Sequence, residues 1–224
     1  MKRILCYGDS NTYGANPAWS PYLSEDEPIP TRFGEDIRWT KLLQKLLGED
    51  QCEIIEEGLC GRTTIYKDPA WPYCEGRSYL TPCLLSHLPL DLIVVMLGSN
   101  DMKEIFAPCP DSASLAMDEF LKTLRNPFLY EGWTMPKILL VSPVFLGENL
   151  ETSYMYGGFT ERGRDVSKQL PEIYAALAKK HGCEFLAASD FASPSPKDSV
   201  HMDEAEHKKL AKALAEKIRK ILAL

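Results

Sequence analysis

The residues best suited to chemistry are a serine near the start of the chain and an aspartate and a histidine near its end. Ser10 follows Gly8-Asp9, and two residues separate Asp198 from His201. A serine hydroxyl becomes a nucleophile when an imidazole takes its proton, and a carboxylate orients that imidazole and stabilises its charged form. The three residues predict acyl transfer, with Ser10 as nucleophile, His201 as general base and Asp198 as the group that orients it.

Acyl transfer also needs hydrogen-bond donors for the oxyanion of the tetrahedral intermediate. The main-chain N–H groups of Ser10 and Gly61 and the side-chain amide of Asn100 are the candidates. Glycine at position 61 lets the backbone approach a ligand closely. Each motif alone is also typical of a turn or a helix cap, so their joint placement decides between the two interpretations.

Five short β-rich runs alternate with helical patterns along the chain. The predicted strands are Arg3–Tyr7, Glu53–Glu56, Asp91–Leu97, Lys137–Val141 and Cys183–Leu186. The predicted helices are Asp36–Leu47, Ser114–Leu124, Asp165–His181 and Asp203–Leu222, and Pro171 either kinks the third of these or marks its start. The alternation predicts a three-layer α/β/α fold with a parallel sheet, in a single domain over residues 1–224.

The candidate residues follow the predicted strands. Ser10 comes after the first strand, Gly61 after the second, Asn100 after the third, and Asp198 with His201 after the fifth. Ligands of open parallel sheets bind beyond the carboxyl ends of the strands. All the candidates are therefore expected at one rim of the sheet.

These motifs resemble the four sequence blocks of the SGNH (GDSL-type) hydrolase superfamily. The blocks are Gly8-Asp9-Ser10, Gly61, Gly98-Ser99-Asn100-Asp101 and Asp198-x-x-His201. The stretches from Ile55 to Thr64 and from Ser78 to Leu92 are similar to its bacterial arylesterase/acyltransferase branch. The resemblance implies a flavodoxin-like sheet of five parallel strands, no cofactor, hydrolysis of short acyl esters, acyl transfer to alcohols, and a homo-oligomer.

The chain departs from the family pattern beside the reactive groups. Asn11 and Ser99 stand where the family often has leucine and threonine, and they are expected to bear on substrate shape. Ala15 is small where the acyltransferase branch has a bulky aromatic residue, a difference that would open the acyl pocket.

Composition limits the partners and the compartment. Acidic residues outnumber basic ones by 32 to 25, which argues against nucleic acid as a partner. No apolar stretch approaches the length of a membrane span, and the apolar run after Lys2-Arg3 is too short for a signal peptide. The seven cysteines include no C-x-x-C pair, which favours buried free thiols in a reducing compartment. A cytoplasmic protein with no membrane partner is predicted.

Aromatic residues are dense in three long loops that follow strands, and they are expected to wall the pocket or form a subunit contact. They include Trp19, Tyr22, Phe33, Trp39, Tyr66, Trp71, Tyr73, Tyr79, Phe145, Tyr154, Tyr156 and Phe159. His207 is predicted on the charged face of the last helix, and Lys103 as a solvated lysine at a helix start.

Four alternatives stay open. A carbohydrate O-acetyl esterase, or a short-chain lipase or thioesterase, would use the same core. An α/β-hydrolase would need a G-x-S-x-G elbow, which is absent. A flavodoxin-like module for a nucleotide or flavin would need a phosphate-binding loop, and neither usual glycine-rich motif occurs. A metal hydrolase could use Asp9, Asn100, Asp198 and His201 as ligands, with activity lost on chelation.

Overall fold

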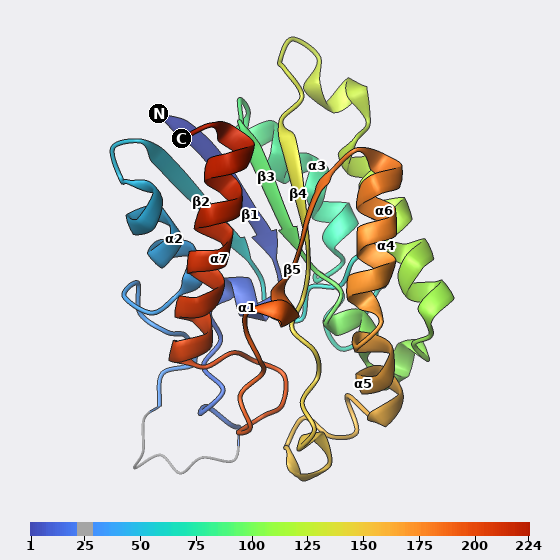
Figure 1. The fold of residues 1–224 in the computed structure, drawn as a ribbon. Helices are drawn as coiled ribbons and strands as arrows, with labels where there is room; N and C mark the ends of the chain where they lie inside the picture. The colour runs from blue at the N-terminus through green and yellow to red at the C-terminus, as the bar shows by residue number, and fades with distance from the viewer. Residues whose placement is uncertain (22–28) are drawn as a thin grey trace.

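A five-stranded parallel sheet forms the centre of the computed structural model, which describes residues 1–21 and 29–224 (Figure 1). The strand order is β2-β1-β3-β4-β5. The strands are β1 (Lys2–Gly8), β2 (Cys52–Gly58), β3 (Leu92–Met96), β4 (Lys137–Ser142) and β5 (Glu184–Ala187). The predicted fold class is confirmed, and each strand lies where the apolar runs placed it.

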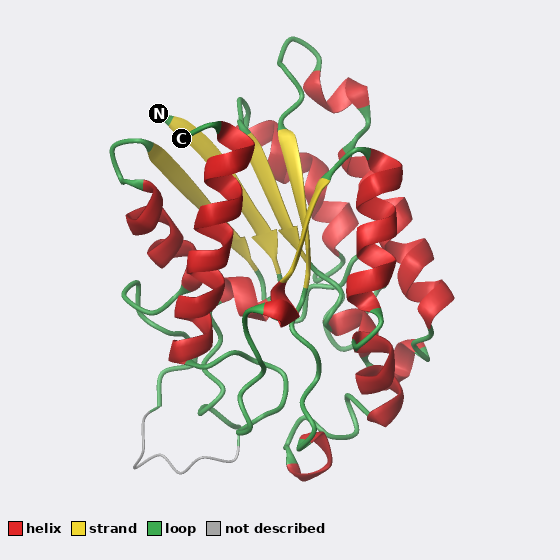
Figure 2. Ribbon diagram, in the orientation of Figure 1, coloured by secondary structure: helices red, strands yellow, loops and turns green. Residues whose placement is uncertain are grey.

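Helices cover both faces of the sheet, which gives three layers (Figure 2). They are α1 (Ser10–Tyr13), α2 (Trp39–Leu47), α3 (Gly76–His87), α4 (Pro110–Leu124), α5 (Glu161–Ser167), α6 (Leu170–His181) and α7 (Glu204–Leu222). Alternate residues of each strand point to opposite faces. Ile4 and Cys6 of β1 accordingly pack with α2 and α7, whereas Leu5 and Tyr7 pack with α3, α4 and α6.

Two helical predictions differ from the structure. The predicted helix 165–181 is part of two helices, α5 and α6, and Pro171 lies in the first turn of α6, where its fixed φ suits a helix start. Helix α3 was not predicted, because Pro82 lies inside it and its apolar residues do not form a clear stripe.

The predicted surroundings of His207 and Lys103 were wrong. His207 is fully buried and accepts a hydrogen bond at Nδ1 from the main-chain N–H of Trp39, with 3.3 Å between the nitrogens. Burial lowers the pKa of His207 to about 4, so this histidine is neutral. Lys103 is mostly buried and forms an ion pair with Asp68, at 2.7 Å. Their charged sequence neighbours had pointed to the surface.

All strands run towards the same edge of the sheet, and the two chain termini lie at the opposite end (Figure 1). The long loops after β1, β2 and β4 therefore gather at the carboxyl edge, together with the segment that precedes α7. Among the described residues, no helix is both long and apolar enough to cross a membrane.

Candidate active site

Ser10 begins the short helix α1, directly after β1. Asp9 caps this helix, because its Oδ1 accepts a hydrogen bond from the main-chain N–H of Asn11, at 3.0 Å. Only glycine fits at position 8, since a Cβ there would lie 2.0 Å from Thr12 Oγ1 and 2.9 Å from the main-chain oxygen of Met96. The tight turn places the Ser10 hydroxyl at the carboxyl edge of the sheet, with 5% of the residue exposed.

The predicted base contacts this hydroxyl, and the predicted carboxylate contacts the other side of the base. His201 Nε2 is 2.9 Å from Ser10 Oγ, and His201 Nδ1 is 2.6 Å from Asp198 Oδ2. The other carboxylate oxygen of Asp198 accepts from the main-chain N–H groups of Val200 and His201, each at 2.9 Å. With Nδ1 donating to Asp198, Nε2 is free to accept the hydroxyl proton. The arrangement can activate a serine for acyl transfer.

Two of the predicted oxyanion donors, Gly61 and Asn100, meet at the loop that follows β2. Gly61 has φ +80°, a conformation that glycine adopts without strain. Asn100 Nδ2 donates one hydrogen bond to the main-chain oxygen of Arg62, at 3.2 Å, and its second N–H remains available. The Arg62 side chain in turn donates to the main-chain oxygen of Gly8, at 2.9 Å. This contact ties the Gly61 loop to the end of β1.

One residue of the site was missed in the sequence. Asp101 is buried beside Asn100, and its carboxylate accepts from Thr64 twice: from the main-chain N–H at 2.9 Å and from the hydroxyl at 2.6 Å. It therefore holds the Gly61 loop against the segment that carries Asn100. Its place in the Gly98–Asp101 run was a signal, but the partner could not be identified without the path of the loop.

Burial raises the pKa of Asp101 to about 7, and the hydrogen bonds from Thr64 oppose this shift. Because the folded-state pKa lies above the unfolded value, the contribution of Asp101 to the free energy of unfolding falls as the pH rises from about 4 to about 7. In Asp101→Asn this titration is absent. The melting temperature of the variant, minus that of the wild type, is expected to become more positive between pH 4.5 and pH 7.5.

Between pH 4.5 and pH 7.5 the effect of this titration on the free energy of unfolding is about 3 kcal/mol at most. Asp111→Asn, at an exposed position in the first turn of α4, is the matched control, and its difference from the wild type should stay flat. A flat difference for Asp101→Asn as well would show that Asp101 does not titrate in this range.

Aromatic residues from two of the loops border the site. Trp71 is 46% exposed, and its Cγ lies 3.8 Å from where a Cβ on Gly61 would stand. Tyr154 is half-buried; burial first, and then the charges of Asp198 and Cys60, raise the pKa of its phenol to about 12. Tyr22 lies outside the described residues.

One group of three potential metal ligands comes together in the part of the chain that the structure describes, and it includes none of Asp9, Asp198 and His201. It consists of Glu57, Cys83 and His87, whose ligand atoms lie within 4.8 Å of one another. Burial and the charge of Glu57 raise the pKa of the Cys83 thiol to about 12, which disfavours the thiolate that a metal needs. His87 Nε2 instead pairs with Glu57 Oε1, at 3.0 Å.

The chain is similar to known proteins in sequence and in structure. Residues 6–209 match the model of the GDSL-like Lipase/Acylhydrolase family. The inhibitor-bound aryl esterase of M. smegmatis is 37% identical, with a TM-score of 0.87 over 99% of this chain and 100% of that one. A search of curated protein sequences gives no significant match.

Two further solved structures are similar over the same extent, covering 99% of this chain and 100% of theirs. Est24, a carbohydrate acetylesterase from Sinorhizobium meliloti, is 34% identical, with a TM-score of 0.88. A putative arylesterase from Agrobacterium tumefaciens str. C58 is 33% identical, with a TM-score of 0.83.

Proposed function

Because the chain belongs to the GDSL-like lipase/acylhydrolase family and is a carboxylic ester hydrolase, we propose that it hydrolyses short-chain acyl esters through an acyl-enzyme on Ser10. Aryl acetates are the first candidate substrates. One observation carries the proposal: His201 Nε2 lies 2.9 Å from Ser10 Oγ while Nδ1 contacts the buried carboxylate of Asp198. This is the geometry of a nucleophile with its base and the group that orients the base.

In the proposed reaction, His201 takes the hydroxyl proton as Ser10 Oγ bonds to the ester carbonyl carbon. The N–H groups of Ser10 and Gly61 and the amide of Asn100 stabilise the resulting oxyanion. As the intermediate collapses, the C–O bond to the leaving group breaks and the departing alcohol takes the proton from His201. Water then repeats the sequence on the acyl-enzyme and releases the acid and the free Ser10 hydroxyl.

The indole of Trp71 supports an aromatic leaving group. It lies over Gly61, next to the proposed oxyanion donor, and almost half of the residue is open to solvent. An aromatic ring bound there would gain stacking energy that a small alkyl group cannot. An acetylated sugar is the second candidate substrate, because Est24 is a carbohydrate acetylesterase and a sugar ring also packs on an indole face.

The substrate proposal predicts a selective effect of Trp71→Ala. The variant should raise KM for phenyl acetate by about 3- to 10-fold and leave KM for ethyl acetate within about twofold, because only the aryl ester loses a stacking partner. Steady-state kinetics with phenyl acetate, ethyl acetate and a peracetylated monosaccharide measure this. A wild-type preference for the sugar ester would favour the second candidate.

Trp133→Ala is the matched control for Trp71→Ala. Trp133 is exposed to a similar degree, 52%, but it precedes β4 and so lies towards the opposite edge of the sheet. Its replacement should change KM for neither ester. Equal effects of Trp71→Ala on the aryl and alkyl esters would contradict a binding role for the indole, and wild-type protein that hydrolyses none of the three esters would contradict the proposed function.

The exposed aromatic side chains support a homo-oligomer. Trp71 is 46% exposed and Tyr73 66%, their ring centroids lie 6.2 Å apart in the loop after β2, and an exposed aromatic patch is typical of a subunit contact. Light scattering of the purified protein should give the mass of two or more chains of 25.2 kDa each. A mass of one chain would contradict this. Acyl transfer to alcohols, the single domain and the cytoplasmic location stay predictions.

A further inference from the structure

Asn11, the residue after Ser10, has all four of its polar groups in hydrogen bonds. It is buried, with 1% exposed. Its main-chain N–H donates to Asp9 Oδ1, at 3.0 Å, and its main-chain oxygen accepts from the indole of Trp39, at 3.0 Å. Its side-chain amide donates to the main-chain oxygen of Val200, at 3.2 Å, and accepts from the main-chain N–H of Met202, at 2.9 Å.

The two side-chain bonds lie on either side of His201. Val200 and Met202 are its immediate sequence neighbours, so a single amide fixes the backbone before and after the proposed base. The amide must present its N–H to a carbonyl and its oxygen to an N–H. Aspartate would place an acceptor against the Val200 oxygen, and leucine would leave both main-chain groups without this partner. Asparagine alone among these three residues satisfies both.

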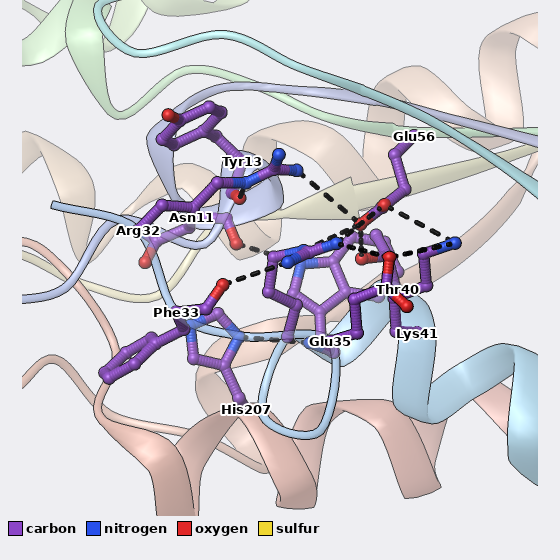
Figure 3. A network of polar contacts seen from close by, with 11 residues as sticks. Asn11, Tyr13, Arg32, Phe33, Glu35, Thr40, Lys41, Glu56 and His207 are labelled. Carbon is purple, nitrogen blue, oxygen red and sulfur yellow. Dashed lines mark hydrogen bonds and ion pairs between the residues drawn. The ribbon is translucent and has the colours of Figure 1, made fainter. Parts of the chain in front are cut away.

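The residues behind Asn11 are buried and hydrogen-bonded to one another. Trp39, which donates to its main-chain oxygen, is 1% exposed and is held at its own N–H by the buried His207 of α7 (Figure 3). The next residue back, Arg38, donates two hydrogen bonds to Glu56 of β2, each at 3.0 Å. Trp39 is the first residue of α2. Together with β2 and α7 it thus fixes the segment from which the Asn11 amide projects.

We propose that Asn11 is a positioning residue, whose amide sets the place of the His201 imidazole relative to the Ser10 hydroxyl. The inference rests on the proposed function. It gives Asn11 a part in proton transfer, whereas the sequence had suggested an effect on substrate shape. A positioning residue of this kind changes the rate of the chemical step and leaves substrate binding unchanged.

The test is Asn11→Leu, which introduces the residue that the superfamily often carries. Displacement of a reacting group by about 1 Å costs about 100-fold in rate. We expect kcat for phenyl acetate to fall by about 10- to 100-fold, with KM within about twofold of the wild-type value. The rate of Ser10 labelling by a fluorophosphonate should fall by the same factor, since labelling uses the same base.

A second variant and a stability control keep the test sharp if Asn11→Leu folds poorly. Asn11→Asp retains the acceptor for Met202 N–H but sets a carboxylate oxygen against the Val200 oxygen, so its kcat should also fall well below that of the wild type. Asp118→Asn weakens the contacts of Asp118 with Lys180 and His181 between α4 and α6 and should lower the melting temperature without changing kcat.

The outcomes separate the two proposals. If wild-type protein is not labelled by the fluorophosphonate, the proposed function fails. If the wild type is labelled and folded Asn11→Leu or Asn11→Asp is labelled equally fast, with kcat within twofold, only the positioning role fails. A fall in kcat that is matched by a rise in KM, or that tracks the folded fraction measured by circular dichroism, would also overturn it.

Discussion

Ser10→Ala and His201→Ala are each expected to lower kcat for phenyl acetate by about 10⁴-fold or more. Without the hydroxyl no acyl-enzyme forms, and without the imidazole the hydroxyl keeps its proton. Because the two groups act as one unit through their 2.9 Å contact, the double variant should be no slower than either single variant. Steady-state rates of the three variants, corrected for uncatalysed hydrolysis, measure this.

The matched control is a serine and a histidine outside the site. Ser86→Ala and His181→Ala change the same residue types on α3 and α6, away from the carboxyl edge of the sheet, and should keep kcat within about twofold. Losses that multiply in the double variant would show that Ser10 and His201 act independently. That result would contradict the proposed proton transfer between them.

Asn100→Ala is expected to lower kcat by about 10²- to 10³-fold, because one donor to the developing oxyanion is lost. KM should change little, since the donor acts on charge that appears in the transition state. The residual N–H donors of Ser10 and Gly61 account for the smaller loss than in Ser10→Ala. Rates measured over a range of phenyl acetate concentrations up to saturation give kcat and KM separately.

Two comparisons test whether this loss reflects the amide itself. Asn126→Ala makes the same substitution at the N-cap of a short helix, Pro127–Tyr130, before β4 and should leave kcat unchanged. The Asn100 amide also holds the Arg62 carbonyl, so melting temperatures of both variants show how much of the effect is structural. An Asn100→Ala variant with wild-type kcat would remove Asn100 from the proposed oxyanion hole.

The centre of the sheet could be predicted because its strands β1, β3 and β4 are largely buried on both faces. Leu92–Met96 is an unbroken apolar run with no exposed residue, a pattern that identifies a central parallel strand. Helix α3 could not be predicted in the same way, since Pro82 and the exposed Tyr79 and Leu85 obscure its buried side. Its position depends on packing against the core rather than on local propensity.

The candidate residues could be placed at one rim because each lies in a segment that leaves the carboxyl end of a strand. The hydrogen-bond partners of the residues at this rim could not be predicted from the sequence. The contact of Asp101 with Thr64 depends on the path of the loop after β2, and the two bonds from Asn11 to the neighbours of His201 join residues about 190 positions apart. His207 shows the same limit: the charged residues beside it suggested exposure, whereas its side chain faces Trp39.

The proposed mechanism requires that Ser10 is the nucleophile and that His201 activates it. The most direct measurement is mass spectrometry of the intact and digested protein after reaction with a fluorophosphonate. We expect one adduct per chain, on the peptide that contains Ser10, with loss of esterase activity in proportion to labelling and no adduct in Ser10→Ala. An adduct on another residue, or full activity in protein labelled at Ser10, would contradict it.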